Sequence, residues 1–250
     1  MNTRRSNIKL LLAYDGTAYF GWQKNSNPSI EECLKKAVEQ ILQEKISLQA
    51  ASRTDRGVHA KGQVVNFFTS REINPLLLKN GINALLPKDI SVLDLTIVED
   101  HFHPTLDAIS KEYVYEVCNS PIQVPFFRTY SWHFPASLNL ELMQEAAQLL
   151  IGSHDFSSFA NERQKGERSL FRISIIPLDN GRFKIVVEGD RFLFKMVRNI
   201  VGTLIYIGCG KIEGDALLAI LEGRDRTLAG VCAPAYGLTL NKVIYEPFKK

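Results

Sequence analysis

A polar, charge-rich stretch between two apolar segments carries the residues best suited to chemistry. Residues 51–68 read ASRTDRGVHAKGQVVNFF, and Asp55 stands between Arg53 and Arg56. Neighbouring cations favour the charged form of a carboxyl group, so the sequence predicts an ionised aspartate here. An ionised carboxylate on a loop can act as a nucleophile. Asp and Gly also suit turn geometry, and an ordinary surface turn remains an alternative interpretation.

Two further segments place useful side chains on a predicted strand and a predicted helix. Tyr113 and Tyr115 should share one face of a strand, because side chains alternate along a strand. Arg198 and Gly202 share one face of a helix, being four residues apart, and the glycine leaves room for a backbone or a ligand. An arginine among apolar neighbours needs a partner, because unpaired buried charge is costly. Sheet aromatics and a surface arginine are the ordinary alternatives.

Composition is that of an ordinary globular protein. The 250 residues are 45% hydrophobic and 23% charged, and the formal net charge of +3 permits an acidic partner without requiring one. The four cysteines form no Cys-x-x-Cys pair, so we expect reduced thiols of a cytoplasmic protein and no zinc site. His101 and His103 alternate as two strand ligands would, but no third ligand is evident. Neither a signal peptide nor a membrane-spanning run is expected.

Hydrophobic periodicity and turn signals predict alternating strands and helices. Ser29 is the expected N-cap of the first helix, and residues 179–181 (DNG) are the expected turn of a hairpin. A further strand should lead into the loop at Ala51, and residues 128–133 could extend or pair with a strand. The other strands are expected over 8–14, 64–69, 90–98, 113–117, 171–178, 182–188 and 238–245, and the helices over 30–42, 74–85, 140–150, 196–207 and 215–221.

Each half of the chain therefore has the order strand, helix, strand, strand, helix, strand. This order is the split βαβ pattern of ferredoxin-like and RNA-recognition folds. We predict an α+β fold of two halves, residues 1–104 and 105–250, whose mainly antiparallel sheets meet at a central cleft. A doubly wound parallel sheet would contradict this prediction.

Several ordered motifs resemble those of the TruA family of tRNA pseudouridine synthases. Residues 52–59, SRTDRGVH, are similar to the family's Gly-Arg-Thr-Asp-x-Gly-Val-His, with Ser52 in place of glycine. Residues 14–23, YDGTAYFGWQ, match its opening motif at every defined place. Residues 192–202, FLFKMVRNIVG, are similar to its Phe-Leu-x-x-Met-Val-Arg-Asn-Ile-Val-Gly, and residues 237–240, GLTL, to its closing Gly-Leu-x-Leu strand.

Two departures from the family pattern involve charge. Lys111 stands where the family often has arginine in Arg-x-Tyr-x-Tyr, so a cation is kept but the planar fork for bidentate phosphate binding is lost. Glu31 stands where the family usually has glutamine, and we interpret it as a surface change.

The resemblance implies an isomerase that converts uridine to pseudouridine at positions 38, 39 and 40 of the tRNA anticodon stem-loop. It implies no cofactor and no metal, because the reaction gains and loses no atoms. By resemblance, Asp55 is the nucleophile or key base, at ribose C1′ or uracil C6, and Arg198 pairs with it. Tyr113 is the active-site tyrosine, and Leu240 packs against the base. Arg53 is the candidate to fill the stack left by the flipped base or to grip the flanking phosphates.

The family works as a homodimer, which implies that one tRNA could touch both subunits. The loop at 161–169 is polar and basic and is expected to be mobile, and His59 is expected to be structural. A non-catalytic RNA-binding protein on this scaffold, or the same chemistry on another RNA, are the alternatives. The cations that could neutralise RNA phosphates are Arg4, Arg5, Lys24, Arg53, Arg56, Lys61, Arg163, Lys165 and Arg168.

Overall fold

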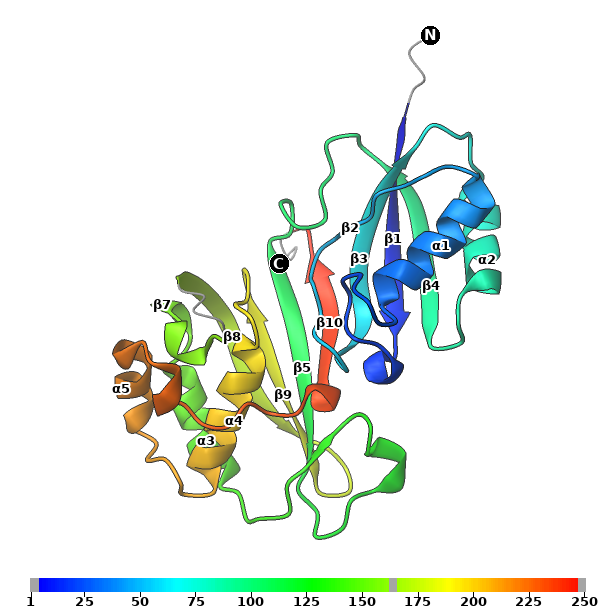
Figure 1. Cartoon of the computed structure of the whole chain (residues 1–250). Coiled ribbons are helices and arrows are strands. Elements are labelled where there is room, and N and C mark those ends of the chain that lie inside the picture. The colour runs from blue at the N-terminus through cyan, green and yellow to red at the C-terminus, as the bar shows by residue number, and fades with distance from the viewer. Residues whose placement is uncertain (1–4, 162–165, 247–250) are drawn as a thin grey trace. The chain divides into compact units, whose positions relative to one another are not determined.

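The computed structural model describes residues 5–161 and 166–246 (Figure 1). The chain divides into two compact units, one of Met1–Ile109 with Leu240–Lys250 and one of Ser110–Thr239. The predicted halves, 1–104 and 105–250, assign residues 105–109 and 240–250 to the other side of this division. Within the described ranges, every helix is too short or too polar to cross a membrane.

The first unit is a layer of two helices on an antiparallel sheet. Its sheet has the order β4-β1-β3, with β2 and β10 at different points along the outer edge of β3. Counted along the chain, the first four strands lie in the order 4-1-3-2, which is that of the split βαβ fold. Its elements are β1 (Ser6–Tyr14), α1 (Ile30–Leu42), β2 (Gln49–Ala50), β3 (His59–Thr69), α2 (Pro75–Leu85), β4 (Ile90–Val98) and most of β10 (Leu238–Ile244).

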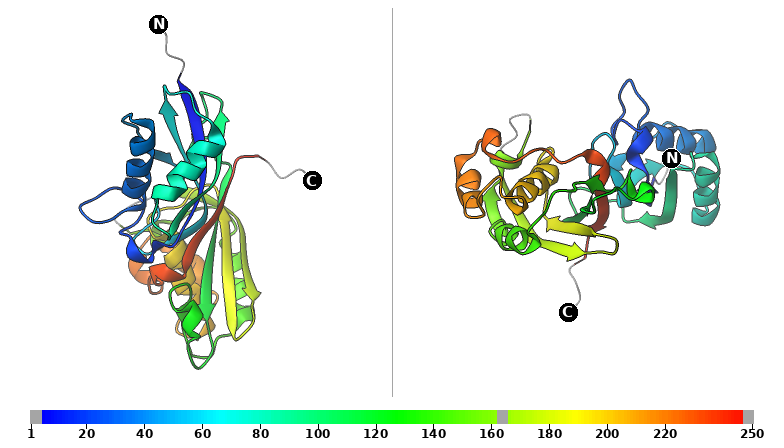
Figure 2. Two further views of the ribbon diagram at one scale, coloured as in Figure 1. Left: turned by 90° about the vertical axis from the view of Figure 1, so that its right-hand side faces the viewer. Right: turned by 90° about the horizontal axis from the view of Figure 1, so that it is seen from below.

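Local sequence signals explain where the two helices of this unit begin. The Ser29 side chain accepts a hydrogen bond from the backbone N–H of Glu32, so Ser29 is the N-cap of α1, as predicted. Asn74 caps α2 in the same way, and Pro75 occupies its first turn. Both helices lie side by side on one face of the sheet (Figure 2). The core lies there, around the fully buried Ile8, Leu10 and Leu12 of β1.

The second unit also combines an antiparallel sheet with helices on one face (Figure 1). Its strand order is β5-β9-β8-β7, and the short β6 pairs in parallel with β5. Asn180 and Gly181 have φ angles of 59° and 67° between β8 and β9, as a tight hairpin turn requires. Its elements are β5 (Ser110–Cys118), β6 (Trp132–His133), α3 (Leu140–Gln148), β7 (Gly152–Asp155), β8 (Glu167–Pro177), β9 (Arg182–Gly189), α4 (Met196–Gly208) and α5 (Ala216–Gly223).

The prediction of an α+β fold with mainly antiparallel sheets is confirmed. The sequence did not indicate β7, whose residues Gly-Ser-His-Asp show no apolar alternation. The predicted loop at 161–169 is wrong at its end, because residues 167–169 begin β8 by pairing with β7. Residues 162–165 of that loop lie outside the described residues. The strand predicted from Val64 begins five residues earlier, at His59.

Candidate active site

The segment that carries Asp55 is held at its start by the side chain of Gln63. We call residues 52–57 the aspartate loop. The Gln63 amide donates to the carbonyl oxygen of Ser52 (2.6 Å) and accepts from the Ser52 N–H (3.2 Å), as a paired strand would. Ser52 does not adopt a positive φ, so its backbone needs no glycine at this place in the motif. The departure from the family's glycine therefore leaves the loop geometry intact.

The opening segment, residues 14–23, holds the aspartate loop in place through hydrogen bonds. The backbone N–H of Trp22 donates to the carbonyl oxygen of Thr54 (3.0 Å), and the N–H of Gly57 donates to that of Tyr19 (3.3 Å). The hydroxyl groups of Tyr14 and Thr54 share a buried hydrogen bond of 2.8 Å. The opening motif therefore positions the loop by direct contacts with its backbone.

Two glycines make this close approach possible. A Cβ atom on Gly16 would lie 2.1 Å from the carbonyl oxygen of Val58. A Cβ atom on Gly21 would lie 2.6 Å from the carbonyl oxygen of Thr54, and Gly21 also has a φ of 94°. No side chain fits at either position without moving the backbone, which accounts for both glycines of the motif.

Asp55 is half-buried between two exposed arginines that are both attached to the opening segment. The Arg53 Nη1 atom donates to the side-chain oxygen of Gln23 (3.2 Å). The guanidinium carbon of Arg56 lies 4.1 Å from the centre of the Phe20 ring, a cation–π contact. Gln23 and Phe20 therefore orient the charged residues of the loop, a role that the linear sequence did not indicate.

The buried His59 connects the end of the loop to the opening segment. Its Nδ1 atom accepts a hydrogen bond from the N–H of Gly16 (3.0 Å) and lies 3.1 Å from Oδ1 of Asp15. A ring nitrogen that accepts from a buried backbone N–H is engaged in structure, which agrees with the structural role expected for His59.

Tyr113 and Tyr115 project from one face of β5 in the second unit and are both buried. The ring of Tyr113 meets the ring of Phe192 edge to face, with centroids 5.1 Å apart. The Tyr115 hydroxyl donates to the carbonyl oxygen of Pro234 (2.8 Å). Burial raises the pKa of Tyr115 well above its usual value, so this hydroxyl remains a donor at neutral pH.

Arg198 lies in the first turn of α4 and holds a neighbouring segment of backbone. Its Nε atom donates to the carbonyl oxygen of Ala233 (2.7 Å), and the N–H of Ala233 donates back to the carbonyl oxygen of Arg198 (3.1 Å). One turn later, a Cβ atom on Gly202 would lie 1.6 Å from the carbonyl oxygen of Val231. Gly202 was expected to leave room for either a backbone or a ligand. The structure shows that the backbone at Val231 fills this space.

Asn199 fixes the start of α4 through both ends of its side-chain amide and was not among the predicted site residues. Its amide nitrogen donates to the carbonyl oxygen of Phe159 (2.7 Å) and to the side-chain oxygen of Asn161 (2.9 Å). Its amide oxygen accepts from Nη2 of Arg226 (2.9 Å). The available signal was a single amide within the apolar run of α4, because a buried amide requires partners.

The structure places the predicted site residues in both units. Arg53 and Asp55 lie on the aspartate loop of the first unit, and Tyr113 and Arg198 lie in the second. Leu240 is fully buried in the part of β10 that groups with the first unit. The chemical roles of these residues, and the pairing of Asp55 with Arg198, stay predictions.

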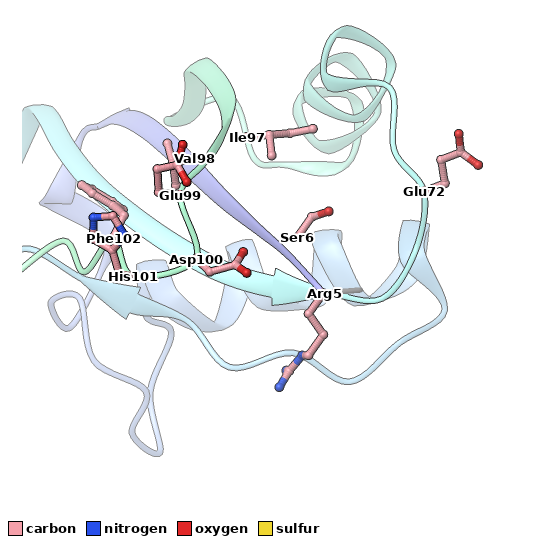
Figure 3. A pocket seen from close by; sticks show the side chains of 9 residues that line it. All are labelled: Arg5, Ser6, Glu72, Ile97, Val98, Glu99, Asp100, His101 and Phe102. Atoms are coloured by element: carbon pink, nitrogen blue, oxygen red, sulfur yellow. The ribbon is translucent and has the colours of Figure 1, made fainter. Parts of the chain in front are cut away.

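An open pocket at the edge of the first unit contains one of the predicted RNA-binding cations (Figure 3). Arg5 lines it together with Glu72, Glu99 and Asp100. Three carboxylates would repel a phosphate, so this pocket does not favour RNA. Within residues 5–161 and 166–246, no cluster of three or more His, Cys, Asp or Glu residues is arranged to hold a metal ion. Arg4, Arg163 and Lys165 lie outside the described residues.

Comparison with known proteins agrees with the motifs. The sequence profile of a family described as tRNA pseudouridine synthase matches residues 11–105 and 146–246, which include the aspartate loop, Arg198 and Leu240. Tyr113 falls in the interval between the two matched ranges.

Three relatives align over almost the whole chain. The tRNA pseudouridine synthase A 2 of Protochlamydia amoebophila is 50% identical, with 96% of this chain and 94% of the relative covered. The tRNA pseudouridine synthase A of Thermoanaerobacter sp. strain X514 is 42% identical, with 96% and 99% covered. That of Chlamydia pneumoniae is 40% identical, with 96% and 92% covered. Because the profile matches most of the chain and these relatives align over nearly all of it, the chain belongs to the tRNA pseudouridine synthase family.

Proposed function

We propose that this chain isomerises uridine to pseudouridine at positions 38, 39 and 40 of the tRNA anticodon stem-loop. The observation that carries the proposal is Asp55, a half-exposed carboxylate on a loop whose backbone is braced by a second motif of the same family. A catalytic group must be held in a fixed geometry, and this bracing supplies it. The names of the relatives support tRNA as the substrate.

The reaction moves one bond and one proton. The bond from ribose C1′ to uracil N1 breaks, the uracil turns, and C5 forms a new bond to C1′. The proton on C5 leaves and N1 gains one, so the atoms balance without a cofactor or a metal. Asp55 attacks ribose C1′ or uracil C6 and so frees the base to turn.

Each of the other site residues has a defined part in this proposal. Arg198 pairs with Asp55 and keeps its carboxyl group ionised, because a nearby cation favours the charged form. Tyr113 stacks on the uracil, and Leu240 packs against it. The target base is stacked in the RNA and must be flipped out, and the planar guanidinium of Arg53 fills the vacated stack or grips the flanking phosphates.

The test is to incubate the purified protein with an unmodified tRNA transcript, without cofactor, and to map pseudouridine by chemical labelling. Pseudouridine at 38 to 40 is the expected product, and Asp55→Asn should abolish it while tRNA binding remains. Product at another position would reject the proposed target site. Binding without product would support the non-catalytic alternative, and turnover by Asp55→Asn would reject the role of Asp55.

We also propose that the protein acts in the cytoplasm as a homodimer. The four cysteines, Cys33, Cys118, Cys209 and Cys232, are all free thiols, which suits a reducing compartment. The homodimer rests on resemblance to the family. Light scattering on the purified protein should give twice the mass of 28.2 kDa, and a strict monomer would contradict this part of the proposal.

A further inference from the structure

Lys111 is a buried cation that the proposed chemistry leaves unused. It lies on β5 two residues before Tyr113, so the two side chains share one face of the strand. Only 6% of Lys111 is exposed to solvent. Among residues 5–161 and 166–246, its ammonium group has neither a hydrogen bond nor an ion pair within 4.0 Å. Its stem is buried, while the ammonium nitrogen keeps some contact with solvent. A largely buried cation without a protein partner is costly, so its presence beside the active-site tyrosine calls for an explanation.

The segment after β9 packs on the sheet next to Lys111 and Tyr113. Gly189 is the residue of β9 opposite Lys111. The Phe192 ring lies against Gly189, with its Cζ atom 3.3 Å from the place where a Cβ would stand. The same ring packs on Tyr113. The Phe192 ring therefore lies on the face of the sheet that carries Lys111 and Tyr113.

The nearby charges do not neutralise Lys111. The Asp190 carboxylate accepts hydrogen bonds from the N–H groups of Ser169 (2.9 Å) and Arg191 (2.7 Å), and lies 3.8 Å from Nε of Arg191. Arg191 repels a second cation. Burial first, and then Arg191, lower the pKa of Lys111 to about 8, against the opposing effect of Asp190. An anion brought close to this group would raise its pKa back toward the usual value.

We propose that Lys111 binds a phosphate of the RNA backbone beside the nucleotide that is held at Tyr113. The inference rests on the proposed function, because it takes RNA as the ligand. An RNA strand brings one anionic phosphate with each nucleotide, and an ammonium group is a compact point charge that suits a single phosphate oxygen. The unpartnered cation thus becomes paired only in the complex.

The experiment compares Lys111→Met, Lys111→Arg and the wild type for binding of an unmodified tRNA transcript. Lys184→Met is the matched control, because Lys184 lies on the same sheet but on the face opposite to Tyr113. Lys111→Met should weaken binding by about tenfold or more at pH 7, the usual effect of one charge-assisted hydrogen bond. It should also lower the slope of log K against log salt by about one. The control should change neither quantity.

Two further readouts separate phosphate binding from a structural role. Wild-type affinity should fall above pH 8, whereas Lys111→Arg should bind equally across this range, because guanidinium stays charged. The melting temperature of free Lys111→Met should exceed that of the wild type. A variant with wild-type affinity and salt slope, or one with a lowered melting temperature, would overturn the inference. Pseudouridine formation by the wild type judges the proposed function independently of these outcomes.

Discussion

Arg198 and Ala233 hold each other through two hydrogen bonds, of 2.7 Å from the guanidinium Nε and 3.1 Å from the Ala233 N–H. The next carbonyl along the chain, that of Pro234, accepts from the Tyr115 hydroxyl. Successive carbonyls of one short segment are thus bound by α4 and by β5. We therefore expect the orientation of the Arg198 side chain to depend on Tyr115, which is not itself expected to contact the substrate.

Removal of the Tyr115 hydroxyl should reveal this dependence. Tyr115→Phe should destabilise the protein by about 1–2 kcal/mol, because the partly buried Pro234 carbonyl loses its donor. It should also lower kcat, because the segment that holds Arg198 loosens. Tyr245→Phe is the matched control. The Tyr245 hydroxyl donates to the carbonyl of Pro104 (2.7 Å), and both residues belong to the first unit, whereas Tyr115 and Arg198 belong to the second. Denaturant unfolding and single-turnover kinetics measure both effects, and an equal loss of kcat in the two variants would contradict the prediction.

A side chain at Gly16 should disturb the contacts that hold the aspartate loop. Gly16→Ala forces the new Cβ against the Val58 carbonyl, and we expect a loss of about 1–3 kcal/mol in stability and a large loss of activity. Gly81→Ala in α2 is the control. Its Cβ would meet only the flexible side chain of Ile41 at 3.2 Å, and alanine favours a helix, so stability should be unchanged or slightly increased. Wild-type turnover by Gly16→Ala would show that the bracing is dispensable.

Asn199 should make a large contribution to the free energy of unfolding. Asn199→Ala removes the partner of the Phe159 carbonyl and of Arg226 at once. We expect a destabilisation of about 2–4 kcal/mol, because each buried polar group left unpaired costs about 1–3 kcal/mol. Asn139→Ala, which removes only the exposed N-cap of α3, should cost about 1 kcal/mol. Thermal and urea unfolding of both variants test the difference, and similar losses would argue against this role of Asn199.

Titration of Lys111 should make the stability of the free protein depend on pH. The pKa of Lys111 is about 8 in the folded chain and 10.5 in its ordinary state, so the unfolded chain binds more protons between these values. Stability from this group therefore rises with pH from 8 to 10.5, and the cost of its charge is fully present below pH 8. That cost is on the order of 3 kcal/mol. Lys111→Met should remove this rise, as measured by urea unfolding of both proteins at several pH values.

Local signals predicted most elements of both units, because caps and alternation act between residues close in sequence. Ser29 and the Asp-Asn-Gly turn at 179–181 are examples of such signals. The early start of β3 was hidden because Lys61 and Gln63 interrupt the apolar pattern. Gln63 is nevertheless fully buried, and its amide is satisfied by the backbone of Ser52. A polar side chain can be buried when backbone groups from another part of the chain bond to it. The residues around it in the sequence do not indicate that partner.

The candidate site also combines residues that the sequence indicates with residues that it does not. Resemblance to the family predicts the candidate residues Asp55, Tyr113 and Arg198, and their roles stay predictions. Their supports could not, since Tyr115 and Pro234 are 119 residues apart in sequence. Contacts of this length depend on the completed fold and leave no periodic signal.

The last strand has a consequence for the synthesis of the chain. Residues 240–246 belong to the first unit, where Tyr245 packs on Phe102 and the N–H of Ile109 donates to the carbonyl of Ile244. A ribosome therefore finishes residues 1–109 long before it makes the strand that completes their sheet. While the second unit is translated, the nascent first unit exposes the part of the outer edge of β3 that β10 later covers. An exposed strand edge is open to pairing with other chains. That part of the edge closes only when β10 has been made.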